Sequence, residues 1–166
     1  MKIRIPRALV VIGVMASLSV AQQEQSANRA APTNSKAQSS HTLVAPESIK
    51  WNALSAGQWF AVVSGSPNTE GAPFVIRIKL ADGVKVAPHW HPVDEHVTVV
   101  TGTFYMGMGE KFNESLATEM PSGSYALMPK EMRHFAWAKG ETIIQIHGIG
   151  SFKTYWVESV EEQNKK

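Results

Sequence analysis

The 166-residue chain contains no cysteine. Disulfide bonds and thiolate metal sites are therefore excluded, and the folded state must be stabilised by its core, with or without a metal held by other side chains. Internal repeats are also lacking, and the length is that of one ordinary domain. Hydrophobic residues make up 43% of the chain and five residues are tryptophan, so we expect a packed core.

The expected mature chain has no excess of positive charge. The formal charge is +2, from 16 basic and 14 acidic residues. Three of the basic residues, Lys2, Arg4 and Arg7, lie in a segment that we expect to be removed, which leaves 13 basic residues against 14 acidic ones. The charge therefore predicts neither a nucleic-acid partner nor an anionic membrane surface as a partner.

The apolar run over residues 8–20 is too short to cross a membrane. It has thirteen residues, whereas a spanning helix needs about 20, and no cationic stop-transfer cluster follows it. A cationic start and the small residues Ser19-Val20-Ala21 are instead typical of a secretory signal peptide over residues 1–21. We therefore expect cleavage after Ala21 and export to the periplasm or the extracellular space, with no membrane contact afterwards; a membrane anchor is the alternative.

Three further segments follow the expected signal peptide. Residues 22–46 are rich in Gln, Ser, Asn and Ala, and their only large aliphatic residues are Leu43 and Val44. Such a composition buries too little apolar surface to offset the entropy of ordering, which predicts a disordered linker. The folded domain is expected over residues 47–160, followed by a charged tail over residues 161–166 that frays.

Short runs enriched in β-branched and aromatic residues recur throughout the expected domain, with turn-forming residues such as Asp82-Gly83 and Lys139-Gly140 between them. The runs predict strands over 58–64, 74–80, 96–100, 103–108, 124–128, 134–138, 142–148 and 153–157. A helical turn is expected over residues 53–57, and no strong helix is expected elsewhere. Many short strands at this spacing predict an all-β sandwich or barrel.

His89, Trp90 and His91 lie between the expected strands over 74–80 and 96–100, in a segment that we take as extended. Alternate side chains of a strand share a face, so His89 and His91 are expected to point the same way and can meet one ion. Glu95 follows at an even offset, after an irregular turn that Pro92 is expected to make. A carboxylate beside neutral imidazoles suits one divalent ion among Mn²⁺, Fe²⁺, Co²⁺, Ni²⁺, Cu²⁺ and Zn²⁺.

These residues carry a resemblance to a known family. The pattern Gly-x5-His-x-His-x3-Glu-x6-Gly is matched at every defined position, by Gly83, His89, His91, Glu95 and Gly102, and it resembles the first motif of the cupin superfamily. Gly123, Pro129 and His134 follow at the spacing of the second cupin motif. Two positions depart from that motif: Glu131 stands where the family usually has glycine, and Ala138 where it often has asparagine.

The resemblance covers roughly residues 70–150 and implies an antiparallel jelly-roll barrel, the double-stranded β-helix of cupins. It implies a metal held by His89, His91, Glu95 and His134, with two positions left for other ligands on an octahedral ion and none on a tetrahedral one. One motif pair implies a single cupin domain. Pairing of barrels into a homodimer is expected from the resemblance alone.

Neighbouring polar residues have two interpretations. His96 is expected to face away from the metal. Gln145 and His147 alternate on one expected strand. If their face points into the barrel, they are candidate catalytic residues that contact a substrate, and otherwise they are packed or exposed.

Four aromatic residues are expected in the core or the barrel wall: Trp90, Trp137, Phe104 and Tyr105. Gly107-Met108-Gly109 lacks the strand-then-helix setting of a nucleotide-binding loop.

The fold alone does not decide the reaction. Our first hypothesis is a metal-dependent enzyme acting on a small polar molecule, of the dioxygenase, isomerase or lyase type. The alternatives are a non-catalytic metal-dependent module that binds or senses a ligand, and an interaction protein that the metal only stabilises. Turnover or ligand binding needs an exchangeable coordination position beside an accessible cavity, whereas a structural metal site is closed.

Overall fold

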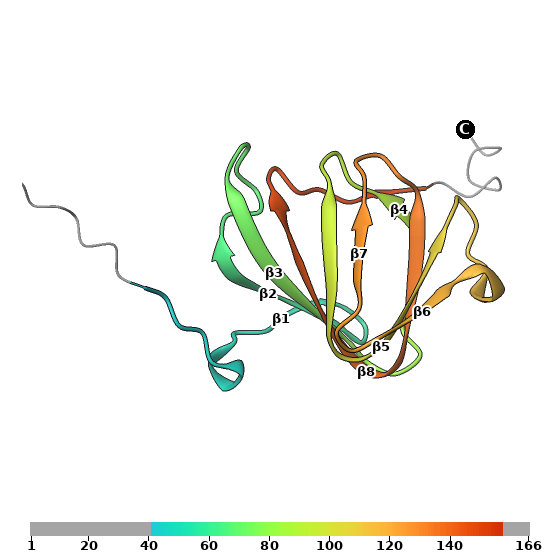
Figure 1. Cartoon of the computed structure of the whole chain (residues 1–166), viewed down its shortest axis with the longest axis horizontal. Helices are drawn as coiled ribbons and strands as arrows, with labels where there is room; N and C mark the ends of the chain where they lie inside the picture. The colour runs from blue at the N-terminus through green and yellow to red at the C-terminus, as the bar shows by residue number, and fades with distance from the viewer. Residues whose placement is uncertain (1–40, 158–166) are drawn as a thin grey trace, which may run out of the picture. The chain divides into compact units, whose positions relative to one another are not determined.

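The computed structural model describes residues 41–157, shown in colour in Figure 1. The expected signal peptide, most of the expected linker and the charged tail lie outside the described residues. Within residues 41–157, no helix has both the length and the apolar character needed to cross a membrane. Two short 3-10 turns, η1 (Pro46–Ser48) and η2 (Glu114–Leu116), accompany strands that make up the rest of the regular structure.

The described part of the chain forms an antiparallel nine-stranded sheet that curls on itself (Figure 1). Its strands are β1 (Asn52–Ser55), β2 (Gln58–Gly65), β3 (Pro73–Leu80), β4 (Lys85–Trp90), β5 (Glu95–Met108), β6 (Thr118–Pro121), β7 (Tyr125–Met128), β8 (His134–Ile149) and β9 (Tyr155–Trp156). The all-β jelly-roll prediction is confirmed by this arrangement.

The two long strands, β5 and β8, pair with each other along most of their length and shape the barrel. The second half of β8 also pairs with β3, and its first half pairs with β4. In the same way, the first half of β5 pairs with β7 and the second half with β6. Each long strand thus belongs to both walls of the barrel, and the register shifts around Gly102 mark the place where β5 passes from one wall to the other.

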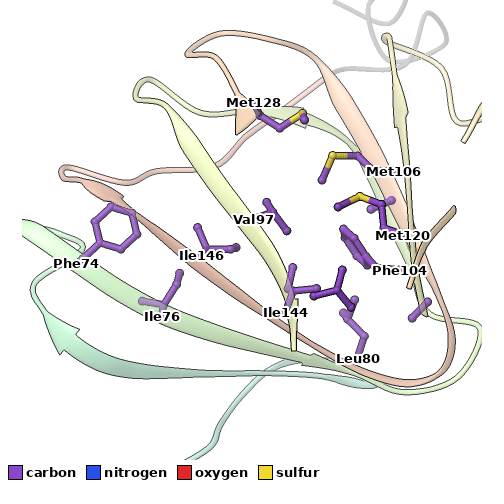
Figure 2. Packing of buried hydrophobic residues seen from close by; sticks show 13 residues of the cluster. Phe74, Ile76, Leu80, Val97, Phe104, Met106, Met120, Met128, Ile144 and Ile146 are labelled. Atoms are coloured by element: carbon purple, nitrogen blue, oxygen red, sulfur yellow. The ribbon is translucent and has the colours of Figure 1, made fainter. Parts of the chain in front are cut away.

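The core lies between the two walls and consists of alternate residues from facing strands, because side chains of a strand point to opposite faces. Val97 and Val99 of β5 and Ile144 and Ile146 of β8 are all at most 5% exposed. Figure 2 shows Val97, Ile144 and Ile146 in the same interior as the labelled residues of β3 and a group of three methionines. The intervening residues of the same strands point outward.

Three local expectations differ from the structure. Residues 53–57 do not form a helical turn: β1 and β2 make a hairpin through Ala56 and Gly57, in which Gly57 has a φ of 71°. A φ in this region suits a tight hairpin turn and favours glycine. Strand β6 was not predicted, since it is short and carries Pro121. The two runs expected on each side of Gly102, and the two on each side of Gly140, are continuous in β5 and β8.

Candidate metal centre

Three strand ends bring the four expected metal ligands together. His89 is the last residue but one of β4, and His91 follows that strand directly. A bend at Pro92 and Val93 then returns the chain, as expected from the proline, so that Glu95 begins β5. His134 begins β8 and is the cross-strand partner of His89. All four side chains are buried, with exposed fractions between 2% and 7%.

The distances place these side chains around one point. The nearest ligand atoms of His89, His91 and His134 all lie within 4.8 Å of one another. Oε2 of Glu95 lies 3.6 Å from Nε2 of His91 and 3.2 Å from Nε2 of His134. The structure therefore brings together the pair identified by its spacing, the carboxylate, and the distant histidine whose position the second motif predicts.

Each of the three imidazoles is oriented by the backbone. The Nδ1 atom of His89 donates to the carbonyl of Ala87 at 2.7 Å, that of His91 to Lys153 at 2.8 Å, and that of His134 to Met132 at 2.9 Å. A carbonyl oxygen only accepts, so the proton of each neutral ring lies on Nδ1. The lone pair of Nε2 is left free on all three rings, which is the tautomer that ligates a metal through Nε2.

Burial and mutual contact set the charges of the site. Burial lowers the pKa of His89 to about 4, helped by the neighbouring His134. Burial also lowers the pKa of His91, and the nearby Glu95 offsets only part of this effect. Burial alone would raise the pKa of Glu95, but His134 and His91 more than offset it, so the pKa is lowered and the carboxylate is ionised at neutral pH.

His134 behaves differently from the other two rings. Burial alone would lower its pKa, but the interaction with the Glu95 carboxylate outweighs burial and raises the pKa instead. Glu95 therefore favours a cationic partner at Nε2 of His134, and a metal ion bound there would take this role in place of a proton.

Two buried atoms of the site test whether a cation fits. Nε2 of His91 and Oε2 of Glu95 are inaccessible to solvent and make no hydrogen bond. Buried polar atoms are nearly always paired, and such an exception is costly unless an ion supplies the missing partner. Three Nε2 lone pairs and one carboxylate oxygen are the donor set of a borderline divalent transition metal. The residues present therefore fit a metal ion.

The four residues lie on the wall of a cavity of about 390 Å³ inside the barrel. Phe104, one of the four aromatic residues expected in the wall, lines this cavity. Two aromatic residues that the sequence did not single out also line it: the ring of Phe152 stacks on His91 with 4.2 Å between centroids, and Trp156 lies 5.3 Å from His89. The expected strand over 153–157 contained Trp156, but no local pattern indicated that this strand passes His89.

The structure does not bring Gln145 and His147 to this cavity. Their strand neighbours Ile144 and Ile146 line it, so the alternate residues Gln145 and His147 face outward. Gln145 accepts a hydrogen bond from Nε of Arg77, and the ring of His147 stacks on that of His96. Both residues are therefore packed or exposed on the outer face, which was the alternative to a catalytic role inside the barrel. His96 points away from the metal centre, as expected, and its Nδ1 lies 2.7 Å from the hydroxyl of Tyr125.

Glu131, which stands where the second cupin motif usually has glycine, has a left-handed backbone conformation. Its φ is 65°, and within the described residues no other residue with a side chain has a positive φ. Its backbone amide donates to the carbonyl of His91 at 2.7 Å, which ties the loop before His134 to the loop after β4. The departure from the second motif therefore changes the residue and keeps the turn.

Comparison with known proteins agrees with the fold and the site. Residues 39–153 match the model of the ChrR cupin-like domain, so the chain belongs to this family of cupins. A comparison with curated proteins finds no match. Similar solved structures therefore provide the remaining comparisons, and at their low sequence identities they show the fold alone.

Three of these structures cover most of the barrel. The polyketide cyclase RemF from Streptomyces resistomycificus has a TM-score of 0.60 at 11% identity, over 74% of this chain and 89% of that one. KdgF from a Halomonas species has a TM-score of 0.54 at 17% identity, over 67% and 96%. A double-stranded β-helix protein from Klebsiella pneumoniae has a TM-score of 0.54 at 18% identity, over 72% and 99%.

Proposed function

We propose that this chain is a metal-dependent cupin that holds one divalent transition-metal ion on His89, His91, Glu95 and His134 and presents it to a small molecule. The observation that carries this proposal is the convergence of three buried Nε2 atoms whose Nδ1 atoms are all fixed to backbone carbonyls. Burial of four polar side chains at one point is costly, and an ion that they share offsets the cost.

The position of the site favours activity on a ligand over a purely structural role. A structural metal site is closed by protein ligands, whereas these four residues line a cavity of about 390 Å³. A bound ion would supply Lewis acidity or, if redox-active, electron transfer. The chain itself would fix the donor atoms through the three carbonyls and exclude water with Phe152 and Trp156. Enzymes of the dioxygenase, isomerase or lyase type use such a site.

A non-catalytic module that binds or senses a ligand is the second candidate. The observation in its favour is the absence of a further acid or base: among the described residues that line the cavity, the titratable ones are the four proposed ligands. The chain would then have to catalyse proton transfer without a dedicated group. Assay of turnover with the metal-loaded protein separates the two candidates. The signal-peptide pattern of residues 1–21 supports action outside the cytoplasm in either case.

Removal of two imidazoles tests the metal centre. In the variant His89→Ala/His91→Ala, we expect the metal content of the purified protein to fall from about one ion per chain to background, because too few donors remain. Elemental analysis together with the electronic spectrum of the natively purified protein measures the content and identifies the ion.

The matched control is His96→Ala/His147→Ala, which also removes two stacked imidazoles but on the outer face of the sheet. This control should retain the full metal content. Full metal content in His89→Ala/His91→Ala would refute the proposed site, and loss of metal in both variants would indicate a global effect on folding rather than loss of ligands.

A further inference from the structure

The cavity beside the three histidines has walls of hydrocarbon. Its lining from β3, β5 and β8 includes Leu80, Val97, Phe104, Ile144 and Ile146, each at most 5% exposed. A volume of about 390 Å³ falls within the range of small-molecule sites, which is about 300–1,000 Å³. The interior of the barrel is therefore large enough for a ligand and offers it mainly apolar contact.

Polar partners for a ligand are few in this cavity. Apart from the four proposed metal ligands and the indole N–H of Trp156, the described lining residues with polar side chains are Ser55, Gln58 and Thr154, all of them neutral. Lysine and arginine do not occur among the described lining residues. A polyhydroxylated or multiply charged molecule would lose its hydrogen bonds to water here without gaining equivalent ones, which opposes its binding. The sequence alone led us to expect a small polar ligand, and this lining differs from that expectation.

Two large apolar side chains lie at the entrance to the cavity, together with the exposed polar residues Ser55 and Thr154. The apolar ones, Leu54 and Trp156, are 55% and 59% exposed, respectively. We call these two residues the apolar rim. Exposed hydrophobic side chains that continue into a cavity favour the entry of a hydrophobic molecule over that of a hydrated one.

The charge of the metal centre defines the polar end of the ligand. Imidazoles bind a metal in their neutral form, so the donor set contributes one negative charge, from Glu95. A divalent ion on this set leaves one positive charge in an otherwise apolar cavity. A single anionic oxygen donor neutralises that charge, which lowers the cost of burying it.

We propose, on the basis of the metal centre proposed above, that the ligand is a largely apolar molecule with one anionic oxygen group, such as a carboxylate, phenolate or enolate. The anionic group lies at the ion, and the hydrocarbon part fills the space between Leu80, Val97 and Ile144. Neither sugars nor phosphorylated molecules have this combination of groups.

Calorimetric titration of the zinc-loaded full chain with straight-chain monocarboxylates from acetate to decanoate tests the proposal. We expect the affinity to rise about threefold to fourfold for each added methylene until the cavity is full, since burial of each methylene removes apolar surface from water. The ω-hydroxy counterpart of hexanoate should bind about tenfold more weakly than hexanoate, because its hydroxyl loses hydrogen bonds to water and the side chains of Leu80, Val97 and Ile144 offer none in return. The metal-free chain should bind none of these acids measurably, since no ion is present to accept the carboxylate.

Leu54→Asp supplies a variant with low risk to folding, because Leu54 is already exposed. It should weaken decanoate about tenfold or more and leave acetate unchanged. The matched control is Leu116→Asp, since Leu116 is 66% exposed and does not line the cavity. The control should bind both acids as the unchanged chain does.

The outcomes separate this inference from the proposed function. Failure of the chain to bind zinc would overturn the proposed metal centre. Zinc binding with an affinity for carboxylates that stays level or falls with chain length would overturn only the apolar ligand, as would equal or tighter binding of the ω-hydroxy acid.

Discussion

At the scale of single residues, Glu131 has a strained backbone conformation that two backbone hydrogen bonds hold in place. Its positive φ is a conformation that costs a residue with a side chain roughly 1–2 kcal/mol, while glycine adopts it freely. Its contacts are made by the backbone: the amide donates to His91, and the carbonyl accepts from Nη1 of Arg133. Glycine at this position would keep both hydrogen bonds.

Glu131→Gly is therefore expected to stabilise the protein by about 0.5–1 kcal/mol. The relief of strain exceeds the extra entropy that glycine gives to the unfolded chain, which is roughly 0.5–1 kcal/mol. Urea unfolding measures the change. Glu141→Gly is the control, because Glu141 is an exposed strand residue whose φ is not positive; it should destabilise, and a loss of stability in both variants would contradict the strain argument.

Residue patterns predicted the metal centre better than its surroundings. His89, His91 and Glu95 are close in sequence, so strand parity and one turn suffice to bring them together. His134 needed the spacing of a motif, because it reaches His89 through pairing of β4 with β8. The direction in which Gln145 and His147 point depends on which face of β8 is buried, and that follows from Ile144 and Ile146 facing the core. The lining of the apolar cavity comes from seven strands, and local patterns do not report it.

At the scale of elements, Gly102 allows β5 to serve both walls of the barrel. It has a φ of 80°, and a Cβ built there would lie 2.5 Å from the carbonyl oxygen of Glu141 and 2.8 Å from Cα of Thr142. Backbone of β8 cannot move away from such a contact without disturbing the strand pairing. Glycine is therefore needed here both for its conformation and for the space that it leaves.

Gly102→Ala is expected to destabilise the barrel by about 3 kcal/mol or more, the sum of the backbone strain and the overlap with β8. The control is Gly123→Ala, since Gly123 has a φ of 89° but nothing lies within 4 Å of its Cβ position. The control should lose only about 1–2 kcal/mol. Thermal and urea unfolding measure both, and equal losses would show that the close approach of β8 has no effect.

The strands could be predicted where the amino-acid pattern is strong and were missed where tertiary pairing decides. The alternation in residues 74–80 and 142–148 reflects one buried face, and both segments are strands. The exposed residues of β1, Asn-Ala-Leu-Ser, have no such alternation, and β1 exists because β2 offers it hydrogen bonds. Turn-forming glycines suggested breaks at Gly102 and Gly140, but the long strands continue through them because each pairs with the other on both sides.

At the scale of the whole molecule, the apolar core and the metal centre contribute separately to stability. The thirteen-residue core cluster includes none of the proposed metal ligands. The metal-free barrel should therefore remain folded, unlike a small domain whose fold depends on its ion. An ion that binds only the folded state still stabilises it, by about 2.7 kcal/mol when its free concentration is 100 times the dissociation constant.

Chelation is thus expected to lower the melting temperature by about 10 °C while leaving the far-ultraviolet circular dichroism at 25 °C unchanged. The lost stability comes from two sources: the ion no longer holds the loop between β4 and β5 to the start of β8, and Nε2 of His91 and Oε2 of Glu95 lose their partner. In His89→Ala/His91→Ala the chelator should have no effect, because no ion is bound. Unfolding on chelation would mean that the core alone does not hold the barrel together, whereas an unchanged melting temperature in the metal-loaded protein would show that the ion does not bind these buried side chains.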